Sequence, residues 1–192
     1  MRKTVWISLS IFFLFMACKQ DANKESIMSS NAEKIKLMTL DPGHFHAALI
    51  QKSMYEEIDP EVHVFAPEGP EVLDFLQKID QYNSREESPT EWKVTTYLGD
   101  DYLSEMIKKR PGNVMVVAGK NSQKIDYVLE AVKAGLNVYA DKPLVIDKVG
   151  YAKLEEAFKV ARKNNVLIYD IMTERFEGHC TWETYIASRL HK

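Results

Sequence analysis

The chain has 192 residues, of which 25 are Lys or Arg and 28 are Asp or Glu, so its formal net charge is −3. A balance this close to neutral gives no reason to expect nucleic acid as a partner, because phosphate backbones are bound by an excess of positive charge. The 2 cysteines are too few for the disulfide framework that staples small secreted domains.

The first residues have the pattern of a signal peptide. Two basic residues precede an apolar run at residues 5–17, which is shorter than the roughly 20 residues of a membrane-spanning helix. Residues 1–17 resemble a bacterial lipoprotein signal because Ala17 directly precedes Cys18, although Phe15 stands where Leu is usual. We expect export and a membrane-anchored, lipid-modified Cys18 on the periplasmic or cell-surface side. The alternative is an N-terminal anchor that is never cleaved.

Three further segments follow. Residues 18–33 are polar and rich in Ser, Asn and Lys, which predicts a flexible tether. Residues 34–177 carry the regular pattern of a folded region and are long enough for one domain. Residues 178–192 do not continue that pattern. We hypothesise that this off-pattern tail marks a truncated product of a longer parent.

Strands are expected where short apolar runs recur, at residues 35–40, 62–66, 93–97, 114–118, 137–140 and 166–171. Helices are expected between them, at residues 44–55, 70–81, 101–109, 122–134 and 147–164, with a polar loop at 80–92. Several of the strands are apolar nearly throughout, which is typical of a sheet covered on both faces. The alternation predicts an α/β fold with a doubly wound, Rossmann-like parallel sheet.

The first strand runs into DPGHFHAAL, residues 41–49, where a dinucleotide-binding fold would carry G-x-G-x-x-G. Gly43 stands at the middle glycine, which lets the backbone approach a pyrophosphate at the start of the next helix. Asp41 and His46 replace the other two glycines. We expect His46 to widen the helix–strand spacing or face a ligand, and Asp41 to be neutralised or turned away. A plain strand–turn–helix junction remains the alternative.

His44 and His46 form an H-x-H pair, which could ligate a metal. The sequence shows no third ligand nearby, and residues two apart on a helix point in different directions. We therefore expect no metal, and the two imidazoles to line a ligand crevice or to pack.

Glu68 follows the second predicted strand, about 25 residues after Gly43 and slightly beyond the usual spacing of roughly 20 for a ribose-binding acid. In that role it would favour NAD, because its charge would repel the 2′-phosphate of NADP. A surface carboxylate near a helix start is the alternative.

Residues 114–145 read VMVVAGKNSQKIDYVLEAVKAGLNVYADKPLV. A buried strand ends in AGKNS, a helix follows, AVKAGLNVY leads into the next strand, and that strand ends in DKP. This segment resembles the glucose–fructose oxidoreductase/inositol dehydrogenase (Gfo/Idh/MocA) family, whose members show an A-T-P-N-like turn, a helix, A-L-x-A-G-K-H-V and E-K-P. The resemblance extends over residues 34–177, which correspond to the family's N-terminal nucleotide-binding domain.

The resemblance implies binding of NAD or NADP and hydride transfer on a small carbohydrate or polyol. It implies that Gly43 and the amides of His44, Phe45 and His46 face the pyrophosphate, and that Ala118, Gly119 and Asn121 lie along the nicotinamide half of the cofactor. It implies that Asp141 and Pro143 form the cofactor side of the E-K-P turn. Lys142 matches the lysine of that turn and would contact the reacting hydroxyl. A buried ammonium in that last position orients the hydroxyl, stabilises developing negative charge and relays a proton, so Lys142 is the expected catalytic residue.

The sequence also departs from the family. Two of three fingerprint glycines are replaced, and the family's second, α+β domain, with its substrate contacts and a catalytic His, is expected to be missing. An exported protein also meets little free dinucleotide. We therefore expect an oxidoreductase-like fragment with weak or no activity alone, and keep two alternatives: a non-catalytic Rossmann module that holds a carbohydrate or a partner, and a glycosidase with tightly held NAD. An uncovered apolar face would favour homo-oligomers.

Overall fold

The computed structural model describes residues 33–171. The predicted signal peptide, Cys18, nearly all of the tether and the tail at 178–192 lie outside these residues. None of the helices among residues 33–171 has the length and apolar character that crossing a membrane requires.

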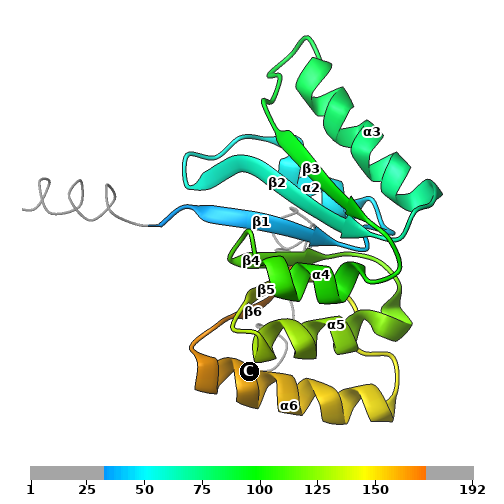
Figure 1. Ribbon diagram of the computed structural model, residues 1–192, viewed down its shortest axis with the longest axis vertical. Coiled ribbons are helices and arrows are strands. Elements are labelled where there is room, and N and C mark those ends of the chain that lie inside the picture. The colour runs from blue at the N-terminus through cyan, green and yellow to red at the C-terminus, as the bar shows by residue number, and fades with distance from the viewer. Residues whose placement is uncertain (1–32, 172–192) are drawn as a thin grey trace, which may run out of the picture. The chain divides into compact units, whose positions relative to one another are not determined.

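Six parallel strands form one sheet in the order β3-β2-β1-β4-β5-β6. The strands are β1 (Ile35–Leu40), β2 (Ile58–Ala66), β3 (Lys93–Leu98), β4 (Val114–Val117), β5 (Asn137–Asp141) and β6 (Ile168–Ile171). Strand β1 is central and pairs with β2 on one side and β4 on the other. The chain therefore builds outward in one direction from β1 and then in the other, which is the doubly wound, Rossmann-like α/β fold that the sequence predicts (Figure 1).

The connections are α2 (His46–Leu49) with a 3₁₀ turn η1 (Ile50–Lys52), α3 (Pro70–Ser84), α4 (Tyr102–Lys109), α5 (Asn121–Lys133) and α6 (Lys148–Asn164). The sheet has a different apolar core on each face. One core joins β1, β4 and β5 to residues of α4, α5 and α6, and the other joins β1, β2 and β4 to residues of α2 and α3. Met38 and Leu40 of β1 point into the first core and Leu37 into the second. Burial on both faces explains the nearly continuous apolar strands.

The helix predicted at residues 44–55 is much shorter in the structure. It is helical only from His46 to Leu49 and then tightens into the 3₁₀ turn. Side chains from a distant loop donate hydrogen bonds to the backbone carbonyls of η1. Trp92 Nε1 donates to Gln51 O at 2.6 Å, and an Arg85 guanidinium nitrogen donates to Lys52 O at 2.6 Å. Helical spacing in the sequence cannot reveal these tertiary contacts.

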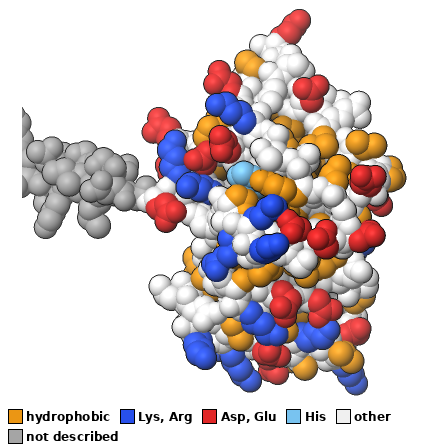
Figure 2. Space-filling view, viewed as in Figure 1, with side chains coloured by type: hydrophobic (Ala, Val, Ile, Leu, Met, Phe, Trp, Pro, Cys, Tyr) orange, Lys and Arg blue, Asp and Glu red, His pale blue; other side chains and the backbone are white. Residues whose placement is uncertain are grey.

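Two other boundaries differ by three or four residues. Strand β2 begins four residues before the predicted start, because Ile58 pairs with Ile35 although Pro60 argues against a strand. Helix α3 continues to Ser84 and takes the first part of the loop predicted at residues 80–92. On the face shown in Figure 2, basic and acidic side chains are interspersed, in keeping with the small net charge.

Candidate functional site

The carboxyl ends of β1 and β4 lie side by side where the winding of the sheet reverses, and the turns that follow them are tightly joined. His44 N–H donates to Ala118 O at 2.8 Å, which ties the first turn to the second. Gly119 allows this approach, because a Cβ atom there would lie 2.4 Å from the carbonyl oxygen of Asp41. Crevices at such reversal points are where open α/β sheets bind their ligands.

Gly43 has a different reason to be glycine. A Cβ atom added there would meet no atom closer than 3.4 Å, an ordinary contact distance. Neither packing nor backbone conformation in the described structure therefore requires glycine at this position. Gly43 lines the pocket at these turns, where a group such as a pyrophosphate can approach its backbone closely.

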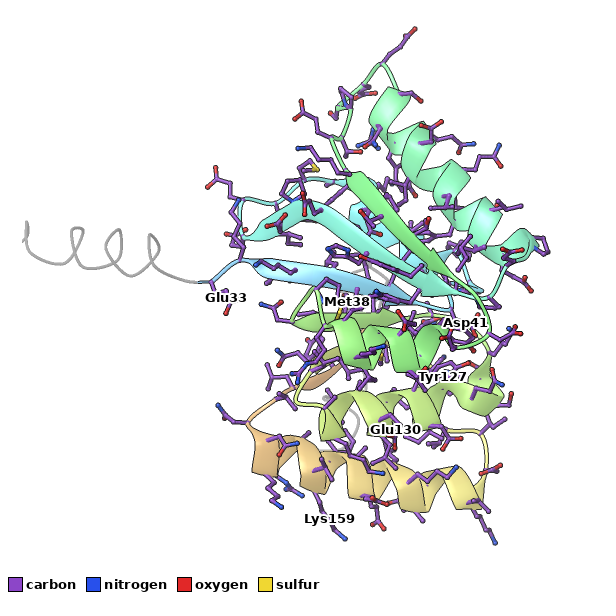
Figure 3. All side chains as sticks on the ribbon, in the orientation of Figure 1. Glu33, Met38, Asp41, Tyr127, Glu130 and Lys159 are labelled. Atoms are coloured by element: carbon purple, nitrogen blue, oxygen red, sulfur yellow. The ribbon has the colours of Figure 1, made fainter. Side chains whose placement is uncertain are left out.

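Asp41 is turned inward and paired, as the sequence requires for an acid near a phosphate site. Its side chain is 3% exposed, and its backbone has a left-handed φ of +44°. One carboxylate oxygen accepts a hydrogen bond from the Tyr127 hydroxyl at 3.2 Å, and the other lies 3.5 Å from Lys120 Nζ. Figure 3 shows Asp41 at the end of β1 and Tyr127 reaching it from α5. Burial, and then the hydrogen bond with Tyr102, raise the pKa of the Tyr127 phenol, which therefore stays a donor to the carboxylate.

His44, His46 and Asp141 come together at the same edge of the sheet. His46 Nδ1 lies 3.0 Å from one oxygen of the Asp141 carboxylate, and His44 Nδ1 lies 3.3 Å from the other. His46 and Asp141 are buried, whereas the His44 side chain is 44% exposed. The structure thus supplies a third group beside the His pair that the sequence does not show. The ring of His46 turns toward the Asp141 carboxylate.

Lys124 is a functional candidate that the sequence reading missed. It is 1% exposed, and its Nζ donates to Asn121 Oδ1 at 2.7 Å, Asp141 O at 2.9 Å and Pro143 O at 3.2 Å. Burial lowers the pKa of this ammonium, and the Asp141 charge acts in the opposite direction. The sequence did offer one sign of its burial: Lys124 lies four residues before the apolar Val128 and therefore on the buried side of α5. Lys124 holds the start of α5 and the turn after β5 together.

The pocket at these turns has a volume of about 350 Å³. Its lining is polar and rich in cations, and consists of Gly43, His44, His46, Gly119, Lys120, Asn121, Asp141 and Lys142. Lys142 is exposed, and its backbone N–H donates to the Asp141 carboxylate at 2.9 Å. The peptide bond between Lys142 and Pro143 is cis. Most residues that the sequence assigns to cofactor and substrate therefore meet in one place.

Four predicted site residues lie apart from the pocket lining. Glu68 is exposed in the loop between β2 and α3, Ala118 is fully buried behind the turn, and Pro143 is exposed and reaches the site only through its carbonyl. Phe45 is 50% exposed and contacts the rings of both flanking histidines.

The expected role of the backbone amides needs a correction. The N–H groups of Gly43 and His44 already donate, to Asp41 O and Ala118 O, so they do not point at a phosphate. Within the described part of the chain, the N–H groups of Phe45 and His46 remain as donors at the start of α2. Because α2 is only one turn long, its dipole gives an anion less stabilisation than a full helix would.

A larger hollow of about 530 Å³ lies elsewhere, bordered by the starts of β1 and β2 and by residues of η1, β5 and β6. Its lining is mostly apolar, and Glu57 is its one carboxylate among the described residues. It holds none of the predicted site residues.

No family model matches the sequence, and no curated protein matches it. Solved structures do match this chain. A candidate oxidoreductase from Parabacteroides merdae ATCC 43184 is 47% identical over 74% of this chain and 33% of its own, with a TM-score of 0.73. A myo-inositol 2-dehydrogenase from Lactobacillus plantarum is 16% identical over 81% of this chain and 41% of its own, with a TM-score of 0.55.

A biliverdin reductase from Synechocystis sp. PCC 6803, solved with biliverdin and NADP⁺, is 13% identical over 71% of this chain and 37% of its own, with a TM-score of 0.52. The chain thus spans between a third and about two fifths of the length of these proteins. The distant likenesses show the fold, and the closer one is to a candidate oxidoreductase. Residues 33–171 form a Rossmann-like domain similar to the corresponding parts of oxidoreductases.

Proposed function

We propose that this chain carries the NAD(P)-binding part of an oxidoreductase of the Gfo/Idh/MocA type that acts on a small carbohydrate or polyol. The observation that carries the proposal is the pocket between the turns after β1 and β4, with Lys142 at its border. The 47% identity to a candidate oxidoreductase supports it.

The residues present fit a dinucleotide at three points. Gly43 leaves room for the pyrophosphate, and the ammonium groups of Lys120 and Lys142 supply positive charge at the pocket. The Asp41 carboxylate does not repel the phosphates, because it is paired with the Lys120 ammonium and accepts a hydrogen bond from the Tyr127 hydroxyl. Glu68, exposed after β2, is proposed to face the adenosine ribose, which slightly favours NAD over NADP.

In this proposal the bound dinucleotide supplies the group that accepts or donates hydride. The chain orients the substrate hydroxyl at Lys142, whose ammonium stabilises the negative charge that develops as the hydroxyl loses its proton. Lys142 is exposed in the described structure, so the proposal requires a further domain to cover it and to complete the substrate site.

A calorimetric titration of the full chain, purified in detergent, with NAD and then NADP tests this function. We expect micromolar binding of one dinucleotide per chain. Gly43→Val should weaken it at least tenfold, because the new side chain fills the space above the turn, while the unfolding free energy changes by less than about 1 kcal/mol. Glu86→Gln, in an exposed loop outside the pocket lining, is the matched control and should bind like the parent chain.

Absence of binding by demonstrably folded protein would overturn the proposal and favour the non-catalytic Rossmann module. Two observations would then explain the result: the shortness of α2 and the engagement of the Gly43 and His44 amides within the turn.

A further inference from the structure

We propose that His44, His46 and Asp141 form a binding site for a divalent transition metal ion, with Zn²⁺ as the best match. Each residue offers one ligand atom, and these atoms all lie within 4.8 Å of one another. The proposal goes beyond dinucleotide binding and does not depend on it.

The spacing of the donors suits a metal. His46 Nδ1 and His44 Nδ1 lie 3.0 Å and 3.3 Å from the oxygens of the same carboxylate. Around Zn²⁺, with ligands about 2.0–2.2 Å from the ion, neighbouring donors of a tetrahedral site are about 3.3–3.6 Å apart. With one ligand atom from each residue, all three atoms lie within 4.8 Å of one another, so the edges of the site must close by at most about 1.5 Å. Binding requires the Nε2–H tautomer of each imidazole, which leaves the Nδ1 lone pair free for the ion.

The local backbone makes two histidines at i and i+2 converge. His44 precedes α2 and is held in the turn by its hydrogen bond to Ala118 O, whereas His46 is the first residue of the helix. The two rings meet edge to face, with centroids 4.3 Å apart. Asp141 arrives from the last position of β5, so the carboxyl ends of two strands bring the donors together.

The groups around the donors hold them in place. The backbone N–H of Lys142 donates to one oxygen of the Asp141 carboxylate, and Lys124 Nζ holds the Asp141 carbonyl. Such supporting hydrogen bonds orient metal ligands and tune affinity.

The donor set and the charges around it define the class of ion. Two imidazoles and one carboxylate suit Zn²⁺ and similar transition metals better than Mg²⁺ or Ca²⁺, which prefer oxygen ligands. Lys142 lines the same pocket and Lys124 Nζ lies 2.9 Å from the Asp141 carbonyl oxygen, so both ammonium groups oppose a cation. We expect weaker binding than at a closed four-ligand site, with the fourth position open to the pocket and favouring an anionic ligand.

The test uses the full chain in detergent, stripped with a chelator and titrated calorimetrically with ZnCl₂ in the absence of dinucleotide. We expect one equivalent bound with micromolar affinity. His44→Gln and Asp141→Asn should each weaken binding at least tenfold, with the far-ultraviolet circular dichroism unchanged. His44 is the safer variant for folding, because its side chain is partly exposed.

His63→Gln and Glu86→Gln are the matched controls, since neither residue belongs to the trio, and both should bind like the parent chain. Cobalt substitution adds a second readout: nitrogen and oxygen donors give only weak visible bands, whereas cysteine ligation gives a strong thiolate-to-metal band. No binding, equal binding by the His44 and Asp141 variants, or a thiolate band would each overturn the proposal. Because the titration contains no dinucleotide, its failure leaves the proposed oxidoreductase function untouched, and the reverse also holds.

Discussion

At the scale of single residues, the two glycines of the site are expected to respond differently to the same change. Gly119→Ala places a Cβ 2.4 Å from the Asp41 carbonyl and 3.0 Å from Gly43 N, and backbone atoms cannot move away cheaply. We expect it to lower the free energy of unfolding by about 1–3 kcal/mol or more. Gly43→Ala should change stability by less than about 1 kcal/mol, because its Cβ makes only ordinary contacts. Urea unfolding followed by circular dichroism measures both, and equal losses would contradict this interpretation.

The same residues show what the sequence could predict about the site. The family resemblance implied one cofactor site for Gly43, Gly119 and Lys142, and the three residues line one pocket because the carboxyl ends of parallel strands share one edge of the sheet. His46 and Asp141 are 95 positions apart in the sequence, and their contact depends on the conformations of two separate turns. No local sequence pattern therefore reveals it. Which backbone amides are already engaged likewise depends on the exact path of the turn.

At the scale of elements, the loop after α3 depends on one side chain. Asn83 Oδ1 accepts from the Thr90 hydroxyl at 2.7 Å and from Trp92 N–H at 3.0 Å, and Asn83 Nδ2 donates to Trp92 O at 2.9 Å. Net contributions of about 0.5–1.5 kcal/mol for each of these three hydrogen bonds predict that Asn83→Ala lowers the free energy of unfolding by roughly 1.5–4.5 kcal/mol. Trp92 should also loosen, since its indole reaches η1 from this loop.

Ser84→Ala is the matched control for this prediction. Its hydroxyl donates to Asp80 O at 2.8 Å in an exposed part of the same helix, and its loss should cost less than about 0.5 kcal/mol. Chemical denaturation gives the unfolding free energy, and tryptophan fluorescence in a Trp6→Phe, Trp182→Phe background reports on Trp92. If the two variants proved equally stable, the loop would not depend on Asn83.

Ends of helices and strands that depend on nearby residues were predictable from the sequence, whereas ends that depend on distant contacts were not. Strand β1 has the predicted ends, because its apolar run and the following Asp-Pro-Gly are sequence signals. Ile125, Val128, Leu129 and Val132 have helical spacing in the sequence and form the buried apolar stripe of α5. Helix α2 was predicted too long because distant side chains end it, and the start of β2 was missed because pairing with β1 overrides its proline.

At the scale of the whole molecule, the proposed attachment to a membrane depends on Cys18 and the residues before it. Each acyl chain on that residue would contribute about 0.8 kcal/mol per buried methylene, and two or more chains give stable anchoring. In a bacterial host we expect the full chain in the membrane fraction, released by detergent and not by high salt. Cys18→Ser should lose lipid labelling, which fatty-acid incorporation measures, and should retain its uncleaved signal peptide, which mass spectrometry measures.

Cys180→Ser changes the other cysteine of the chain and should leave labelling and fractionation unchanged. Labelling that survives in Cys18→Ser would place the lipid elsewhere, and an unlabelled parent chain with residues 1–17 intact would replace the lipoprotein interpretation with an uncleaved N-terminal anchor.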